Sequence, residues 1–278
     1  MIGAGKTMTE IAFSCIISVY VKEQPRFLSQ CLDSIVKQTV LPDELIIVKD
    51  GPLTDDLETV LREFQYPNEL KIVPLPENVT QGPARAEGIQ AAKHEWVAVM
   101  DSDDICRPDR FEKQLEMITR QPELSIIGGQ ISEFEDDPKH SAAKRTVPCK
   151  HDEIIKFAKK RNPFNQMTVM FKRSAAIVAG NYRYFPGFED YDLWVRMIAD
   201  GAICANHPDI LVDARVGGGM YSRRRGLSYV RAEWRMQKML KSLGLINALE
   251  FVRNVTLRIP VRLLPKKAVK AFYNLFAR

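Results

Sequence analysis

Three carboxylates follow directly after a run of apolar residues at 96–100, and they are the strongest chemical signal in the chain. The apolar run predicts a buried strand that leads into Asp101. Side chains two positions apart point the same way in an extended chain, so Asp101 and Asp103 face a common point. Two such carboxylates repel each other unless a hard divalent cation lies between them and a ligand's phosphate oxygens. The alternative is an acidic loop before the helix expected near Pro108, because Asp is common in loops and at helix starts.

The first half of the chain alternates predicted strands and helices, which favours an α/β fold with a parallel, Rossmann-like sheet and right-handed crossovers. Ligands bind beyond the carboxyl ends of the strands in such sheets. Tyr20, Asp50 and Asp101 all follow strand-like runs, so one cleft can hold all three. The predicted strands are 13–20, 45–48, 70–75 and the run entering Asp101, and the predicted helices are 25–36, 54–65 and 83–93.

The second half is less regular and ends in a basic segment. Residues 221–278 hold 14 Lys and Arg against two acidic residues, a net charge of +12, whereas the first 220 residues hold 26 basic and 33 acidic residues, or −7. An acidic body with a basic tail suggests separate roles for two regions. We therefore expect a disordered start at 1–12, an α/β domain at 13–220 and a basic amphipathic helical tail at 221–278. The second half of the α/β domain has strand-like segments near 125–134 and 167–171 and a polar loop at 135–150. It also has helices near 151–160 and from Glu189.

The length of 278 residues fits one large α/β domain, alone or with an appendage. The five cysteines are scattered without a CxxC pair, which is typical of a protein from a reducing compartment. The four histidines are dispersed along the sequence and suggest no metal cluster. No apolar run approaches the ~20 residues that span a bilayer, and the first dozen residues lack the features of a signal peptide. We therefore expect a cytoplasmic protein.

Two further segments could contact a nucleotide. Asp50 ends a buried strand before a Gly-Pro turn, so it is either a turn aspartate or an acceptor for a base or ribose. Residues 78–88 predict a tight loop entering a helix, with Arg85 in the first turn. Helix-start amides and a guanidinium suit a diphosphate or ribose, although a solvated arginine on an ordinary helix has the same pattern.

Residues 187–194 place acidic side chains in the first turn of a predicted helix, where the helix dipole favours them whatever the function. A carboxylate aimed into a cleft there could act as a general base toward a hydroxyl. Asp190 and Asp192 diverge by about 200° around a helix, so they cannot both face the cleft. The flanking aromatics could supply dry walls or a stacking face for a sugar. The arginines at 223–225, after three glycines, are either a solvated run or a group that closes over a diphosphate.

Taken in this order, these residues closely resemble a bacterial family 2 glycosyltransferase, of the kind that builds capsule, exopolysaccharide or O-antigen repeat units. The resemblance covers roughly residues 13–225. The ordered set is specific, whereas no single piece is. The matching pieces are 17–20, Gln38 with Thr39, 43–51, 78–88, 101–104 with Pro108, 162–165, and Glu189 and Asp190 with Leu193 and Arg196.

The resemblance implies a GT-A fold in which a nucleotide-binding sheet is flanked by helices, with a basic helical appendage at the C-terminus. It implies that Asp103 binds Mg²⁺ or Mn²⁺ and that Asp190 is the catalytic base. It assigns Val19, Tyr20, Asp50, Arg85, Asp101 and Arg224 to the nucleotide, and Asn162, Asn165, Glu189 and Trp194 to the acceptor or donor-sugar pocket.

The implied reaction is an inverting, metal-dependent transfer of one sugar from a nucleotide-sugar, with UDP expected as the nucleotide. The implied acceptor is a saccharide linked to polyprenyl diphosphate. The chain lacks the Gln-x-x-Arg-Trp pattern of processive polymerases, which argues for one addition at a time. Apolar residues interleaved with Lys and Arg at 221–278 predict contact with an anionic membrane surface, and hence a peripheral protein at the inner face of the cell membrane. The alternative is that these helices pack on the catalytic domain.

Two other functions share part of this pattern. A nucleotidyltransferase that makes sugar nucleotides also has a metal site at a strand end, but it should carry a glycine-rich first loop, which residues 20–23 do not form. A nucleic-acid-binding module would explain the basic tail but not the acidic cleft, which repels phosphate backbones in the absence of a metal. We therefore expect no nucleic-acid partner.

Overall fold

The computed structural model describes residues 11–217 and 226–263, and its centre is a nine-stranded sheet. Residues 1–10, most of the predicted start, lie outside the described part, as do Arg224 and the end of the tail. The strand order is β3-β2-β1-β4-β8-β6-β9-β5, and β7 pairs with β6 off this path. The strands are β1 (Phe13–Val19), β2 (Glu44–Lys49), β3 (Glu69–Pro74), β4 (Trp96–Asp101), β5 (Ile105–Cys106), β6 (Leu124–Phe134), β7 (Ala143–Arg145), β8 (Met170–Lys172) and β9 (Ile203–Arg215).

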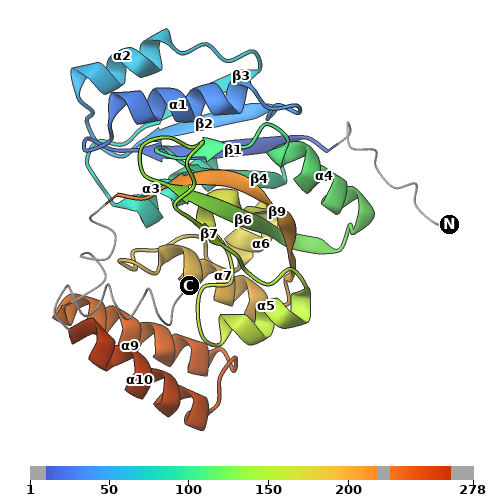
Figure 1. Ribbon diagram of the computed structural model, residues 1–278, viewed down its shortest axis with the longest axis vertical. Coiled ribbons are helices and arrows are strands. Elements are labelled where there is room, and N and C mark those ends of the chain that lie inside the picture. The colour runs from blue at the N-terminus through green and yellow to red at the C-terminus, as the bar shows by residue number, and fades with distance from the viewer. Residues whose placement is uncertain (1–10, 218–225, 264–278) are drawn as a thin grey trace.

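The first four strands form the predicted parallel sheet (Figure 1). From β1 the chain runs outward through α1 (Pro25–Val36) to β2 and through α2 (Asp55–Glu63) to β3. It then returns through α3 (Gln81–Ala91) to β4, on the other side of β1. The strand order therefore reverses between β1 and β4, and such a switch point is where open α/β sheets bind their ligands.

The rest of the sheet is mixed. Strand β8 runs antiparallel to both β4 and β6, whereas β9 runs parallel to β6. Strand β9 was not predicted, because Pro208 interrupts the strand-like pattern. In the structure the register of β9 against β6 shifts between Gly129 and Gln130, and this irregularity accommodates the proline. The helices of this half are α4 (Arg110–Arg120), α5 (His151–Ala158), α6 (Arg173–Val178) and α7 (Glu189–Ala199), with a 3-10 turn at Gln166–Thr168.

Helices cover both faces of the sheet, and the inner parallel strands β1, β2 and β4 are accordingly buried along almost their whole length. Side chains alternate along β1, so that Cys15 and Ile17 pack with α1, α2 and α4. Ile16, between them, packs with the cluster that includes side chains of α3, α5, α6 and α7. The two cores hold the carboxyl ends of β1, β2 and β4 in fixed relative positions.

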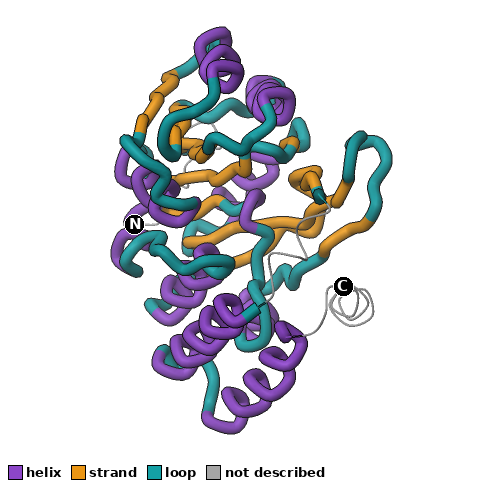
Figure 2. Tube along the Cα trace, turned by 90° about the vertical axis from the view of Figure 1, so that its left-hand side faces the viewer, coloured by secondary structure: helices purple, strands orange, loops and turns teal. Residues whose placement is uncertain are grey.

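The described part of the basic tail forms two helices, α9 (Leu227–Ser242) and α10 (Ala248–Leu263). Both lie beyond α7 at the edge of the molecule, at the bottom of Figures 1 and 2. No helix within the described residues is long and apolar enough to cross a bilayer. The two helices are joined to the body by a third apolar cluster, which contains Phe185, Phe188, Tyr191, Val195, Tyr229, Ala232, Met236, Leu240 and Ile246.

Candidate active site

The switch point brings four of the predicted nucleotide-binding residues to neighbouring strand ends: Val19, Tyr20, Asp50 and Asp101. Ser18 of β1 pairs in register with Asp101 of β4, so Val19 and Tyr20 lie beside the acidic loop. The backbone N–H of Asp50 donates to the carbonyl oxygen of Val19 at 2.8 Å. Val19 is buried, whereas Tyr20 is 38% exposed and available to a ligand.

Asp50 holds the loop that leads into α3. Its Oδ1 accepts from the N–H of Val79 at 2.7 Å, and its Oδ2 accepts from Nδ2 of Asn78 at 2.9 Å. Burial raises the pKa of Asp50, and the N–H groups of Val79 and Thr80 oppose this rise. Because each carboxylate oxygen has two lone pairs, Asp50 can hold the loop and still accept from a ligand.

Arg85 joins the two sides of the cleft. It is buried in α3 and forms an ion pair with Asp101. Burial lowers the pKa of Arg85, but the charges of Asp101, Tyr182, Asp190 and Glu189 raise it overall, so these groups share its surroundings. In the described part of the chain its Nε has no hydrogen-bond partner. The guanidinium is therefore paired with Asp101 and also feels the charges of the two acids that start α7.

Asp103 carries the charge that a cation would balance. Burial, followed by the charges of Asp101 and Glu23, raises the pKa of Asp103 to about 7. Within residues 11–217 and 226–263 there is no group of three or more His, Cys, Asp or Glu that could hold a metal alone. Mg²⁺ is usually held by one or two carboxylates together with substrate phosphates, and Mn²⁺ also takes hard oxygen ligands, so this donor set fits either ion.

Arg215, at the end of β9, holds the acidic loop in place, and sequence reasoning missed it. Its backbone N–H donates to Oδ1 of Asp104 at 2.7 Å, and its Nε donates to the carbonyl oxygen of Asp103 at 3.1 Å. Its guanidinium carbon lies 3.8 Å from the ring centre of Phe27 and 4.6 Å from that of Phe134. The signal that could have identified Arg215 is an arginine at the end of a strand. It could not be used because strand β9 was not predicted.

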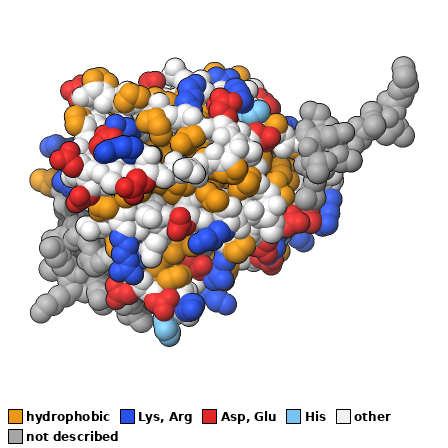
Figure 3. Space-filling view, turned by 90° about the horizontal axis from the view of Figure 1, so that it is seen from above, with side chains coloured by type: hydrophobic (Ala, Val, Ile, Leu, Met, Phe, Trp, Pro, Cys, Tyr) orange, Lys and Arg blue, Asp and Glu red, His pale blue; other side chains and the backbone are white. Residues whose placement is uncertain are grey.

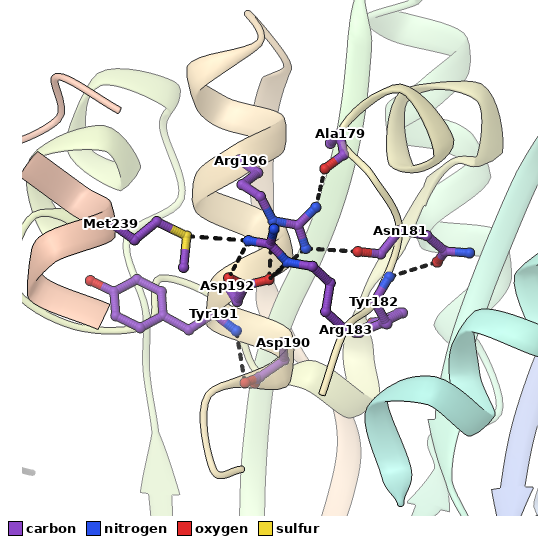
Figure 4. A network of polar contacts seen from close by, with 9 residues as sticks. All are labelled: Ala179, Asn181, Tyr182, Arg183, Asp190, Tyr191, Asp192, Arg196 and Met239. Atoms are coloured by element: carbon purple, nitrogen blue, oxygen red, sulfur yellow. Dashed lines mark hydrogen bonds and ion pairs between the residues drawn. The ribbon is translucent and has the colours of Figure 1, made fainter. Parts of the chain in front are cut away.

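The opposite wall contains the proposed base. Asp190 lies in the first turn of α7, where its Oδ2 accepts from Nδ2 of Asn162 at 2.6 Å. Asp192, by contrast, is fully buried and forms ion pairs with Arg183 and Arg196 (Figure 4). The two aspartates therefore diverge as the helical spacing predicts, and Asp190 is the one on the side of Arg85.

The starts of α3 and α7 touch, so the first turn of α7 lies beside the helix that carries Arg85. A Cβ at Gly82 would lie 2.5 Å from the carbonyl oxygen of Arg183 and 2.9 Å from Cγ of Glu189. Glycine is therefore required for this approach. Burial, with a further contribution from Asp190, raises the pKa of Glu189. Glu189 thus lines the junction between the nucleotide side and the base side.

Two predicted pocket residues are placed in the core instead. Trp194 has no exposed surface, and its ring packs against Phe164, Phe171 and Tyr182. Asn165 is equally buried and donates to the carbonyl oxygen of Gly129. Neither side chain can reach a sugar in this arrangement. Trp194 lies one turn beyond Asp190 on α7, and this turn of the helix packs against the sheet.

A parallel sheet with acidic side chains at its switch point defines an α/β protein built to hold a nucleotide. The family described as "Glycosyl transferase family 2" matches residues 14–183. The chain is also 47% identical over 266 residues to an uncharacterized glycosyltransferase of Haemophilus influenzae, covering 96% of this chain and 99% of the relative. The chain therefore belongs to glycosyl transferase family 2 and is a glycosyltransferase.

Two further relatives carry more specific names. The amylovoran biosynthesis glycosyltransferase AmsE of Erwinia amylovora is 38% identical over 265 residues, covering 94% of this chain and 98% of the relative. The UDP-Gal:alpha-D-GlcNAc-diphosphoundecaprenol beta-1,3-galactosyltransferase of Escherichia coli is 35% identical over 268 residues, covering 94% and 97%. These relatives confirm the prediction that the chain is an enzyme, and they disfavour the alternative of a non-catalytic binding module.

Solved structures confirm the predicted GT-A fold. S. aureus TarS 1–349 in complex with UDP-GlcNAc superposes with a TM-score of 0.68 at 14% identity, covering 95% of this chain and 73% of that one. The mannosyltransferase PcManGT of Pyrobaculum calidifontis, in complex with GDP-Man and Mn²⁺, gives a TM-score of 0.65 at 17% identity, covering 96% and 77%. At these identities the likeness establishes the arrangement of the chain.

Proposed function

We propose that this enzyme transfers one sugar from a UDP-sugar to a saccharide carried on polyprenyl diphosphate, with inversion, in the synthesis of a surface polysaccharide. The name of the E. coli relative specifies a UDP-sugar donor and a diphosphoundecaprenol-linked acceptor. The name of the Erwinia relative specifies amylovoran biosynthesis. Both matches extend over nearly the whole chain, which supports the same classes of donor and acceptor here.

The observation that carries this proposal is that α3 pairs with Asp101 through Arg85 and touches the start of α7 at Gly82. A nucleotide-sugar at the switch point would place its anomeric carbon between the strand ends and Asp190. Asp190 then accepts the proton of the acceptor hydroxyl as that oxygen attacks the anomeric carbon. A single displacement with one base and no covalent intermediate inverts the anomeric centre.

The other residues of the cleft orient the reactants. Asn162 holds Oδ2 of Asp190, and the N–H of Tyr191 holds its Oδ1 at 2.8 Å, so the carboxylate has a fixed direction. Asp103, with Asp101, would hold Mg²⁺ or Mn²⁺, which when bound neutralises charge on the departing nucleoside diphosphate. Arg85 adds a fixed positive charge on the same side of the cleft.

The proposal is tested with radiolabelled UDP-Gal, UDP-Glc, UDP-GlcNAc and GDP-Man, each with synthetic GlcNAc-diphosphoundecaprenol and Mn²⁺. We expect one UDP-sugar to be hydrolysed slowly alone and transferred faster with the acceptor, and EDTA to abolish both. The product linkage, read by NMR, should have the opposite anomeric configuration to the donor. A retained configuration, or activity with GDP-Man alone, would contradict the proposed chemistry.

We also propose that α9 and α10 rest on an anionic membrane surface at the inner face of the cell membrane. Arg231, Lys238 and Lys241 are exposed on α9. On α10, Leu249 and Val252 are 82% and 60% exposed. Basic and apolar side chains together bind anionic leaflets, and each cation near the surface contributes about 1 kcal/mol. On the face in Figure 3, by contrast, acidic and basic side chains are interspersed.

The membrane proposal is tested by flotation of the full chain with vesicles that contain phosphatidylglycerol. We expect the triple variant Arg231→Gln, Lys238→Gln, Lys241→Gln to float less than the parent. The matched control replaces exposed cations elsewhere by Gln, at Lys37 and Arg120, whose side chains are both 74% exposed, and at Arg62. Both variants have the same net charge, so equal flotation of the two would refute a specific role for α9.

A further inference from the structure

We propose that the C-terminal helices α9 and α10 are part of the catalytic apparatus, because they position the general base. Asp190 and its partner Asn162 lie on two segments 28 residues apart. The helices contact both segments, and Tyr229 and Asn254 are the positioning residues. This inference rests on the proposed role of Asp190 as the base.

The first contact fixes the turn that starts α7. Gly187 has φ +78°, a conformation that favours glycine. The ring of Tyr229, from α9, fills the space where a side chain would stand, since a Cβ at Gly187 would lie 2.8 Å from its Cε2. The same ring lies 5.2 Å from that of Phe188. The turn immediately before Asp190 is therefore packed directly against α9.

The second contact fixes the segment that carries Asn162. Nδ2 of Asn254, from α10, donates to the carbonyl oxygen of Lys159 at 2.9 Å, three residues before Asn162. The hydroxyl of Tyr191 donates to the carbonyl oxygen of Ala158 in the same turn. The end of α5 is thus held by α10 on one side and by the start of α7 on the other.

A third contact reaches the loop before α7. Figure 4 shows Met239 of α9 beside Arg183, whose Nη2 lies 3.6 Å from the methionine sulfur. The same guanidinium is bonded to Asp192. Helix α9 therefore contacts one of the two arginines whose ion pairs anchor the first turn of α7.

The two helices are held together by a buried ion cluster, so they can act as one support. Glu233 has no exposed surface and accepts from Arg258 at 2.8 Å, Arg262 at 3.1 Å and Gln237 at 3.0 Å. The guanidinium carbon of Arg262 also lies 4.7 Å from the ring centre of Tyr229. The ion cluster is therefore in contact with the ring that packs on the turn before Asp190.

A support of this kind acts on turnover, since a shift of about 1 Å in a reacting group can cost about 10²-fold in rate. Tyr229→Ala should lower kcat for the donor found in the panel by about 10-fold or more, while UDP and Mn²⁺ bind as in the parent. Tyr229→Phe keeps the ring and should restore kcat to within twofold. The matched control is Trp234→Ala, which removes a partly exposed ring of α9 that packs on Phe251 of α10.

Hydrogen exchange supplies a readout that needs no substrate. In Tyr229→Ala, peptides covering 185–191 and 159–165 should exchange faster than in the parent, whereas in Trp234→Ala they should not. Unchanged exchange in both segments of Tyr229→Ala would overturn the inference, as would an equal loss of kcat in the two variants.

A double variant separates this inference from the proposed function. If Asp190 is the base and Tyr229 acts through it, adding Tyr229→Ala to Asp190→Asn lowers the residual kcat by less than twofold. If Asp190→Asn turns over normally, the assigned base is wrong and the inference falls with it. If Asp190→Asn is inactive while Tyr229→Ala keeps the parental kcat, the base stands and the supporting role of the helices is refuted.

Discussion

The proposed nucleotide side and the proposed acceptor side of this glycosyltransferase position their functional groups in different ways. On the nucleotide side, Tyr20, Asp50 and Asp101 stand at the ends of adjacent parallel strands, so the sheet itself brings them together. On the acceptor side, Asp190 and Asn162 come from a helix start and a loop, and contacts from α5, α9 and α10 hold them. Sheet topology fixes the first set, whereas long-range packing fixes the second.

The charges of the two sides differ in the same way. Asp103 lies among carboxylates, and burial and these charges raise its pKa to about 7, so this side favours binding of a cation. Asp192 is buried but paired with Arg183 and Arg196, so its charge is balanced within the protein. The first arrangement suits a ligand that brings positive charge, and the second suits a rigid support for Asp190.

Replacing the proposed base, Asp190, should impair the acceptor side alone and should have the largest effect on turnover. We expect Asp190→Asn to lower kcat by about 10²–10⁴-fold, because the amide cannot accept the proton of the attacking hydroxyl. UDP binding should be unchanged, since the strand ends are intact. Turnover and UDP titration by calorimetry measure the two effects. Asp200→Asn, at the exposed end of the same helix, is the matched control. Near-parental turnover in Asp190→Asn would remove this residue from the mechanism.

Replacing Asp103 should break the nucleotide side alone. In the parent, Mn²⁺ should raise the affinity for UDP, and in Asp103→Asn this gain should fall by about tenfold or more, about 1.4 kcal/mol. The reason is that a neutral amide is a weaker ligand for a hard cation. The measurement is UDP binding with Mn²⁺ and with EDTA. Asp109→Asn, in a partly exposed pair with Lys113, controls for lost charge. An equal response to Mn²⁺ in parent and variant would place the cation elsewhere.

The sequence predicted the parallel strands and their carboxyl ends well, because the rules for these features are local. Apolar runs ending in Asp50 and Asp101 identify two strands, and the carboxyl ends of parallel strands share one edge of the sheet. It also predicted that Asp190 and Asp192 diverge, since that follows from helical spacing alone. Local sequence patterns are therefore sufficient to predict the parallel half of the fold.

What the sequence could not supply depends on contacts between distant segments. Trp194 was expected near a sugar because it stands close to Asp190 in the chain, but only the packing of α7 on the sheet shows that it is buried. Arg215 lies 112 residues from Asp103, on a strand that Pro208 concealed. No periodicity links such pairs, and the same holds for Tyr229 and Gly187.

Arg215 holds the acidic loop that follows β4, so its replacement should weaken both stability and nucleotide binding moderately. Arg215→Lys keeps the charge but loses the planar group between Phe27 and Phe134. We expect the free energy of unfolding in urea to fall by about 2 kcal/mol, as for the loss of a hydrogen bond to a charged group. The control Arg120→Lys, in an exposed pair, should change it by about 0.5 kcal/mol or less. Equal losses in the two variants would show that Arg215 does not hold the acidic loop.

The smallest effect should come from Trp194→Phe, which asks whether this aromatic residue belongs to the core or to the sugar site. Its Nε1 has no hydrogen-bond partner within the described residues, so the substitution removes packing only. We expect a loss of about 1 kcal/mol in the free energy of unfolding, since a ring of similar shape still packs on Phe164 and Tyr182. A stacking platform would instead raise KM for the acceptor at unchanged stability. Because a buried ring cannot contact a sugar without moving α7, unfolding in urea and acceptor KM measured on one sample distinguish the two roles.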